Sequence, residues 1–200
     1  MIGPFDVHER KRIFELAESG QLPKGFDQWD MPDLSVSGRT LAFATFANGH
    51  GPGPEFTRWN MRDGQGRTMA HYAALHGKLP VDFDHWLLTD PDSWSVAHEY
   101  AYRNVLPAEF PYWAVTDARG QAVAYIAALK GNLPPDFYRW NIRTPQGSTV
   151  AHIAACRGDL PDGFDQWNLA DSDGKTVREV FDEHVAKRPG QSCRSAGPKM

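Results

Sequence analysis

Large apolar side chains recur along this chain at a fixed interval. Tryptophans stand at positions 29, 59, 86, 113, 140 and 167, so the intervals are 30, 27, 27, 27 and 27 residues. A phenylalanine precedes each of these tryptophans by three residues. A fixed period in the range of about 20 to 50 residues is typical of a stacked solenoid, in which each unit contacts only its neighbours. The pattern therefore predicts stacked repeats that bury the rings in a shared hydrophobic spine.

Two recurring sequence motifs, called phrases below, make up each repeat. The first places small alanines after a Thr that can cap a helix, as at Thr68 and Thr149, and predicts a helix of about nine residues. The second begins with glycine, a residue suited to the left-handed end of a helix, and continues through Leu-Pro. Proline is favoured at the first position of a helix. We therefore expect a second helix of about seven residues with Phe and Trp on one face.

The two ends of the chain differ from the repeats. Residues 1–29 form a predicted N-terminal capping repeat, with a helix over 5–19 whose start carries the capping-box spacing of Asp6 and Glu9. Residues 30–167 hold the repeats anchored by the tryptophans at 59, 86, 113, 140 and 167, and three extra residues fall in the repeat 30–56. Residues 168–187 are predicted as a C-terminal capping helix. The Pro/Gly/Ser-rich segment 188–200 is predicted to be a flexible tail.

The first phrase resembles the ankyrin-repeat hallmark G-x-T-P-L-H-x-A-A-x-x-G. It reads Gly66-Arg-Thr68-Met-Ala-His71-Tyr-Ala-Ala74-Leu-His-Gly77 in one repeat and recurs through Thr149, His152 and Gly158. The resemblance covers residues 30 to 185, although these repeats have 27 residues where ankyrin repeats have about 33, and the proline of the hallmark is absent.

This resemblance implies an all-α fold, an α-solenoid of stacked helix-turn-helix repeats with short second helices and short turns. The turns leave little room for extended β-hairpins between repeats. In ankyrin-like proteins the repeated histidine hydrogen-bonds to neighbouring backbone, and that role is expected for His71, His98 and His152. The resemblance also implies a protein partner.

Composition narrows the choice of partner. The net charge is −4, which does not indicate a nucleic-acid-binding surface. No apolar run approaches the ~18 residues of a membrane span, and the charged N-terminus lacks the apolar core of a secretory signal. The two cysteines, Cys156 and Cys193, do not make a disulfide framework, which favours a reducing compartment. We predict a monomer that does not bind membranes, in the cytoplasm of its own cell or of a host cell.

Catalytic and metal chemistry find little support in the sequence. The repeated histidines occupy helices that pack about 8–10 Å apart, whereas zinc needs each ligand nitrogen at about 2.1 Å. Nucleophile-elbow, P-loop and dinucleotide motifs are absent from the sequence. Cys156 falls where other repeats have Leu75, Tyr102 and Leu129, which indicates packing. The repeated Asp63, Asp90, Asp117 and Asp171 suit turns. We predict that the protein is not an enzyme and that it has no metal site and no cofactor.

The repeat 87–113 departs most from the template. Ser93 replaces a glycine, and Trp94 stands where other repeats have Arg67 or Gln121. Because Trp, Tyr and Arg dominate interface hot spots, this repeat is the best candidate for a binding surface. The predicted partner-binding residues are Trp94, Tyr100, Tyr102, Tyr112, Glu99, Arg67 and Arg119. Alternatively, Tyr100 and Tyr102 only fill a cavity left by the glycines that this repeat has lost.

The sequence thus predicts a non-enzymatic protein–protein interaction module that binds a partner protein through a solenoid surface. Such a module could serve as an effector, an inhibitor or an immunity-type protein. The alternative is an enzyme or a small-molecule-binding protein with a pocket near the aromatic cluster of the repeat 87–113.

Overall fold

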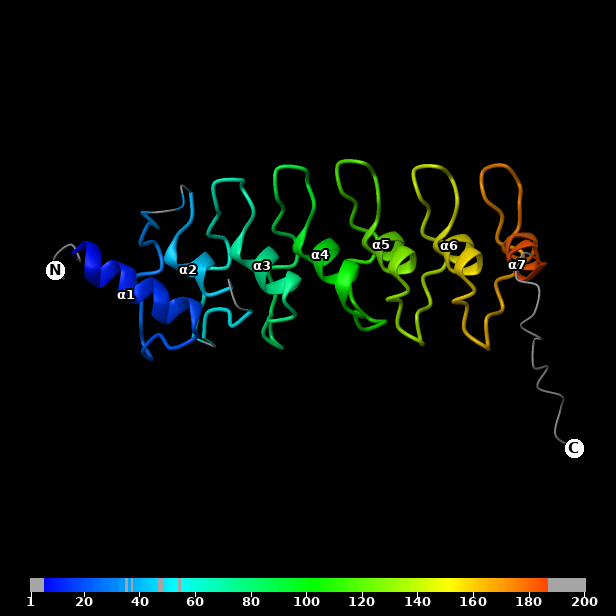
Figure 1. Ribbon diagram of the computed structural model, residues 1–200. Helices are drawn as coiled ribbons and strands as arrows, with labels where there is room; N and C mark the ends of the chain where they lie inside the picture. Colours follow the sequence, from blue (N-terminus) through cyan, green and yellow to red (C-terminus); the bar gives the residue numbers. More distant parts are fainter. Residues whose placement is uncertain (1–5, 35, 37, 47–48, 54, 187–200) are drawn as a thin grey trace, which may run out of the picture.

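The chain folds into a single row of short helices (Figure 1). The computed structural model describes residues 6–34, 36, 38–46, 49–53 and 55–186. Within these ranges the helices are α1 (Val7–Glu18), α2 (Leu41–Ala44), α3 (Met69–Leu75), α4 (Val96–Arg103), α5 (Val123–Lys130), α6 (Val150–Arg157) and α7 (Val177–Ala186). Each helix packs against the next one along the chain. The predicted α-solenoid of stacked repeats is therefore confirmed.

The N-cap residues recur at the same position of each repeat and determine where the helices begin. Thr68, Ser95 and Thr149 are the N-caps of α3, α4 and α6, and each is followed three residues later by a histidine that completes a capping box. The side chains thereby satisfy N–H groups that a helix start leaves without partners. The predicted helix over 5–19 corresponds to α1, where the Asp6 carboxylate accepts from the Glu9 N–H at 2.8 Å.

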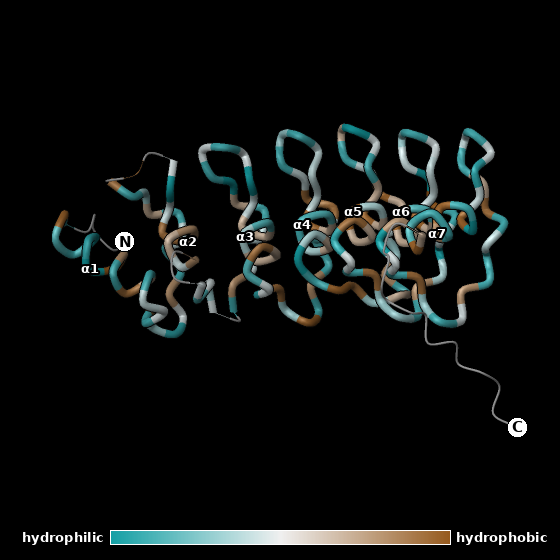
Figure 2. The backbone as a smooth tube through the Cα atoms, turned by 45° about the vertical axis from the view of Figure 1, so that its right-hand side comes forward, coloured by the Kyte–Doolittle hydropathy of each residue, from teal (hydrophilic) through white to brown (hydrophobic). Residues whose placement is uncertain are grey.

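Between helices the chain projects as short loops, which we call fingers. Five of them span residues 63–67, 90–94, 117–121, 144–148 and 171–175. The residues that flank each finger form a single antiparallel bridge, for example Thr89 with Ser95. One bridge per finger agrees with the expected lack of room for an extended hairpin. The fingers project from one side of the row, and Figure 2 shows them as predominantly hydrophilic.

The second half of each repeat differs from the prediction. Between each Leu-Pro corner and the finger that follows it, no described residue is helical. The predicted short second helix is therefore wrong. The segment instead makes two separate turns, in which the Phe83 N–H donates to the Pro80 carbonyl and the Leu88 N–H donates to the His85 carbonyl. These two turns place Phe83 and Trp86 against the core without a helix.

Those rings form a continuous ladder through the solenoid. From Phe26 to Trp167 the phenylalanines and tryptophans alternate, and Phe181 of α7 extends the series. Every step has ring centroids 5.0 to 5.7 Å apart and ring planes 69° to 89° from each other. Edge-to-face pairs of this kind contribute about 0.5–1.5 kcal/mol each beyond the burial of their area. The predicted hydrophobic spine is therefore confirmed.

Small side chains allow the helices to pack closely beside this ladder. The buried alanines include Ala70 and Ala74 of α3, Ala97 and Ala101 of α4, and Ala124 of α5. Each of them is fully buried, and the same positions recur in the next helix because the repeat preserves the helix phase. The buried residues form three successive clusters along the row, and the half-buried Trp86 and Tyr100 pack against both of the larger two.

The C-terminal end is a longer helix. Helix α7 spans Val177–Ala186, within the segment 168–187 predicted as a C-terminal capping helix. Lys187 and the predicted tail 188–200 lie outside the described residues. Among the helices described, each one is too short or too polar to span a lipid bilayer.

Candidate functional site

The backbone of each finger is held by an aspartate. In the finger 90–94 the Asp90 Oδ1 atom accepts hydrogen bonds from the N–H groups of Asp92 and Trp94, both at 3.0 Å. Asp63, Asp117 and Asp171 make the same pair of bonds in their own fingers. The predicted role of the repeated aspartates in turns is confirmed.

The finger 90–94 contains a strained residue. Ser93 has φ +60°, the only non-glycine residue with positive φ in the described part of the chain. The corresponding positions of neighbouring fingers carry Gly66, Gly120 and Gly147, which also have positive φ. A residue with a Cβ atom pays about 1–2 kcal/mol in this left-handed region, whereas glycine does not. The repeat 87–113 thus keeps the backbone shape of the template at a local cost.

The repeated histidines attach each helix to the following finger. The His71 Nε2–H donates to the Trp94 carbonyl at 2.8 Å, and the His98 Nε2–H donates to the Gln121 carbonyl at 3.0 Å. A peptide carbonyl only accepts, so Nδ1 of the neutral ring accepts from the N-cap hydroxyl, at 2.7 Å in both cases. Burial lowers the pKa of both histidines. The expected hydrogen bonds from histidine to neighbouring backbone are confirmed.

Two arginines strap neighbouring fingers together, and the central fingers lack this strap. Arg62 donates to the carbonyls of Gly66 and Thr89, and Arg143 makes the matching bonds to Gly147 and Ala170. The two positions between them in the repeat series carry Thr89 and Thr116. The fingers 90–94 and 117–121 are joined instead by a 3.4 Å hydrogen bond from the Ala118 N–H to the Asp92 carbonyl.

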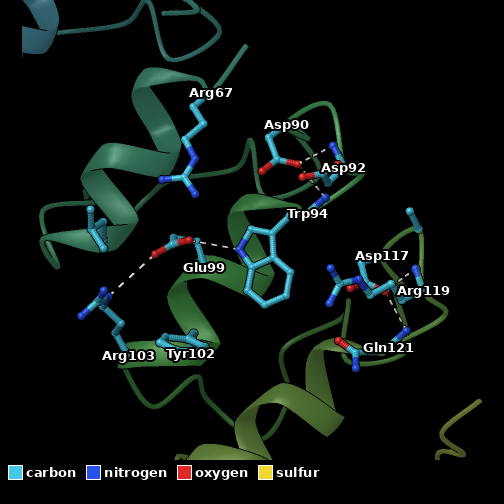
Figure 3. A pocket seen from close by; sticks show the side chains of 12 residues that line it. Arg67, Asp90, Asp92, Trp94, Glu99, Tyr102, Arg103, Asp117, Arg119 and Gln121 are labelled. Atoms are coloured by element: carbon cyan, nitrogen blue, oxygen red, sulfur yellow. Dashed lines mark hydrogen bonds and ion pairs between the residues drawn. The ribbon is translucent and has the colours of Figure 1, made fainter. Parts of the chain in front are cut away.

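A groove of about 510 Å³ lies between these two fingers and helix α4 (Figure 3). Its lining residues come from three fingers and two helices. They are Arg67, Leu75, Asp90, Asp92, Trp94, Glu99, Tyr102, Arg103, Asp117, Ala118, Arg119 and Gln121. Several of them, including Arg67, Asp92 and Arg119, are exposed, so the hollow is an open groove rather than a closed cavity.

Trp94 is fixed at the centre of the groove by contacts on two sides. Its ring lies 5.1 Å from the ring of the buried His98, measured between centroids. Its Nε1–H donates to the Glu99 Oε2 atom at 3.0 Å, and Glu99 also faces the Arg103 guanidinium at 3.8 Å (Figure 3). The side chain is only half-buried. The groove therefore presents a large aromatic surface that is held in place before any partner arrives.

Tyr102 forms the second aromatic wall. Its ring centroid lies 6.4 Å from that of Trp94, and the side chain is 39% exposed. The Lys130 ammonium sits 3.8 Å from the ring centroid, and a hydrogen bond donated by Lys130 lowers the pKa of the Tyr102 hydroxyl. Tyr102 is thus held by the following helix.

The structure gathers five of the predicted binding residues and separates two. Arg67, Trp94, Glu99, Tyr102 and Arg119 all line the groove. Tyr100 and Tyr112 do not line it, and they pack instead against the ring ladder, at 5.4 Å from Trp86 and 5.5 Å from Phe110. Helix geometry explains the difference on α4, because residues two apart point to nearly opposite sides. The predicted role of the five groove residues in binding a partner stays a prediction.

Other residues of the groove were missed by the sequence reasoning. Leu75 matches Leu129 at the same position of another repeat, and Arg103 resembles Lys130 and Arg157, so neither residue stood out from the template. Cys156, which shares the position of Leu75, was predicted to be packed, and that prediction is wrong because its side chain is exposed. This position faces solvent along the row of helices, as the 43% exposure of Leu129 also shows. The 27-residue period shows that these residues share one position in successive helices, but the sequence does not show that this position is exposed.

Comparisons with known proteins identify the fold. No protein-family model matches this sequence, and no curated protein matches it. Among solved structures the chain is similar to the ankyrin repeat domain of Bcl-3, described as a unique member of the IkappaB protein family, with a TM-score of 0.54 and 14% sequence identity. The similarity covers 85% of this chain and 96% of that domain. The chain therefore has the fold of an ankyrin-repeat domain, assembled from shortened repeats.

Proposed function

We propose that this chain is a non-enzymatic protein-interaction module that binds a partner protein through the groove around Trp94. The observation that carries the proposal is the position of this indole. It is half-buried, held by Glu99 and His98, and set in an open groove of about 510 Å³ between two fingers. Aromatic side chains that are fixed in advance and still partly accessible are the usual centres of interface hot spots.

The groove offers little for catalysis. A nucleophile and a base must lie within hydrogen-bond reach of each other and of a substrate. Ser95 and His98 do form such a pair, but both side chains are fully buried and the free ring nitrogen bonds to a backbone carbonyl. The Thr68–His71 and Thr149–His152 pairs repeat the arrangement. The pair therefore serves as a helix cap, which favours a binding role over an enzymatic one.

The open shape favours a protein ligand over a small molecule. Small-molecule sites bury most of the ligand in a concave pocket, whereas exposed residues such as Arg67 and Arg119 form the walls here. A module of this kind acts by covering a surface of its partner, as an effector, an inhibitor or an immunity-type protein does. The monomeric state and the cytoplasmic location stay predictions.

Affinity capture with matched variants tests the proposal. The wild-type chain, Trp94→Ala and Tyr138→Ala would be used as baits, because Tyr138 is an aromatic residue that is 54% exposed and lies outside the groove. We expect a partner that wild type and Tyr138→Ala retain and that binds Trp94→Ala about thirtyfold more weakly, which corresponds to about 2 kcal/mol. Trp94→Phe, which keeps most of the packing on His98, should give an intermediate affinity.

A folding control accompanies this measurement. Trp94 contacts both His98 and Glu99, so its truncation should lower the free energy of unfolding by about 1 kcal/mol. Binding is therefore measured under conditions in which urea titration shows each variant to be folded. Equal binding of the partner to wild type and folded Trp94→Ala would refute the proposed site.

A further inference from the structure

We propose that the occupant of the groove is an extended, acidic segment of the partner, with an apolar side chain placed on Trp94 and carboxylates placed between the arginines. This inference rests on the proposed function and specifies the chemistry of the partner. It follows from three properties of the residues around the groove, namely an apolar floor, the charges that remain available after internal pairing, and the spacing of the repeats.

The apolar floor extends beyond the groove along successive helices. Leu75, Tyr102, Leu129 and Cys156 occupy one position in α3, α4, α5 and α6, at intervals of 27 residues. Tyr102 is 39% exposed and Leu129 is 43% exposed. An apolar row of this kind suits a ligand that lies across several helices, and a compact ligand would cover only one of its members.

The cations of the groove are more available than its carboxylates. The guanidinium groups of Arg67 and Arg119 form no hydrogen bond or ion pair with any described residue, although each comes from a finger that lines the groove. Arginine is suited to bind a carboxylate through two parallel hydrogen bonds. These two arginines are therefore free to receive acidic side chains from a partner.

Most of the carboxylates that line the groove already accept hydrogen bonds from other groups of the chain. Asp90 and Asp117 each accept two backbone N–H groups of their own finger. Glu99 accepts the Trp94 Nε1–H and faces Arg103. A basic ligand would have to compete with these bonds and would find Asp92 as its principal free carboxylate. The lining holds four carboxylates and three guanidinium groups, and the net charge of the chain is −4, so the preference for an acidic ligand rests on the two unpaired arginines and not on the net charge of the groove.

A second row of cations lies on the helix side of the apolar floor. Arg103, Lys130 and Arg157 follow Tyr102, Leu129 and Cys156 directly in the sequence, at the ends of three consecutive helices. Lys130 lies over the Tyr102 ring, and Arg157 donates to the Leu129 carbonyl at 3.1 Å, so both stay next to the apolar row. Arg103 faces Glu99 at 3.8 Å and Arg157 pairs with Asp159 at 2.6 Å. Lys130 is therefore the cation of this row that an acidic ligand would meet without a competing ion pair to a described residue.

The spacing of the repeats indicates an extended ligand. Helices packed side by side lie about 8–10 Å apart. A polyproline-II-like chain rises about 3.1 Å per residue with three residues per turn, so every third side chain points the same way at intervals of about 9.3 Å. Such a segment can place one side chain on each repeat. We infer a ligand with apolar residues at every third position and acidic residues between them.

Peptide selection tests the inference directly. The full chain is immobilised, and a displayed library of random peptides of about twelve residues, enough for three repeats at three residues each, is selected against it. We expect the retained peptides to contain more Asp and Glu than the input library and apolar residues at a spacing of three. Retention of mainly neutral or basic peptides, or no retention of any peptide, would overturn the inference.

A charge swap makes the test specific to the groove. The Arg67→Glu/Arg119→Glu variant should bind the selected acidic peptides about tenfold more weakly than wild type in fluorescence anisotropy, with a loss that shrinks at high salt. Selection against this variant should favour peptides with Lys and Arg. The matched control is Arg12→Glu/Lys78→Glu, which changes the net charge equally at exposed positions outside the groove. Equal effects of the two double variants would overturn the inference.

The test also separates this inference from the proposed function. Peptides that lose binding to Trp94→Ala but carry no acidic residues would leave the proposed function standing and would refute the acidic ligand. Peptides that bind Trp94→Ala as well as wild type would refute the groove itself, together with the inference.

Discussion

Replacing Trp113 by alanine should remove the most deeply buried step of the ring ladder. Trp113 is completely buried, and its ring makes edge-to-face contacts with Phe110 at 5.7 Å and with Phe137 at 5.1 Å. Its Nε1–H donates to the Ala108 carbonyl at 3.0 Å. The side chain therefore joins two consecutive repeats near the middle of the solenoid.

Three losses add to the expected effect. Truncation of a buried tryptophan to alanine costs about 3–5 kcal/mol through lost burial and the cavity that remains. Each lost edge-to-face pair accounts for about 0.5–1.5 kcal/mol, partly counted already in the first figure, and the Ala108 carbonyl loses its hydrogen-bond donor. We expect the free energy of unfolding to fall by about 5 kcal/mol, a large fraction of the roughly 5–15 kcal/mol typical of a domain.

Urea unfolding followed by far-UV circular dichroism measures this loss. The matched control is Trp167→Ala, since Trp167 is only half-buried and lies next to the last helix, where it contacts Phe164 and Phe181. Loss of a terminal contact affects one interface, whereas loss of a central contact interrupts the stack on both sides. We expect Trp167→Ala to lower the free energy of unfolding by about half as much as Trp113→Ala does. A loss below about 2 kcal/mol for Trp113→Ala, or a loss no larger than that of Trp167→Ala, would refute the ladder as the main source of stability.

Three further predictions concern the fingers and the helix caps. Ser93→Gly should raise the free energy of unfolding by about 1 kcal/mol in urea titration, because glycine adopts the positive φ of this position without strain. Arg143→Ala should lower the free energy of unfolding by about 1–2 kcal/mol because two carbonyls lose a hydrogen-bond donor. Arg119→Ala should leave the free energy of unfolding unchanged, and equal effects of the two variants would contradict the role of Arg143 as a strap. Burial lowers the pKa of His71 and His98 in the folded chain, so the unfolded chain binds more protons; stability should be complete above the ordinary imidazole pKa of about 6.5 and decline as the pH falls below it. Urea midpoints between about pH 5 and 7 should show this decline in wild type and a weaker one in His71→Gln/His98→Gln.

The sequence was sufficient to predict the solenoid because its core positions repeat. A ring at Trp86 must meet the same neighbours as a ring at Trp113, so the period of the tryptophans is also the period of the fold. The second helix could not be excluded by the same reasoning. Phe83 and Trp86 are three residues apart, and that spacing brings two rings together on a helix as well as in the two successive turns that begin at Pro80 and His85. Whether this segment forms a helix or two turns depends on how its rings fit the ladder, and the ladder is a property of the whole stack and not of one repeat.

The candidate site was predictable where a residue departs from the template. Trp94, Glu99 and Arg67 differ from their counterparts in other repeats, and all three line the groove. Arg103 resembles Lys130 and Arg157 at the same position, so its place in the groove could be found only from the coordinates. Departure from a template shows that a residue is free to vary, and the structure then decides which side of the helix it faces.

The finger 90–94 differs from the others in ways that do not favour stability. It carries Ser93 where neighbouring fingers have glycine. Like the finger 117–121 with Thr116, it is preceded by a threonine, Thr89, at the position where Arg62 and Arg143 supply straps. Both alternatives occur elsewhere in this same chain, so the chain can accommodate them. Residues that break a local rule without a structural gain are expected at functional sites, where stability is exchanged for binding. These departures adjoin Trp94 and the groove. That coincidence, more than the presence of a groove, is the reason to propose a binding surface at this finger.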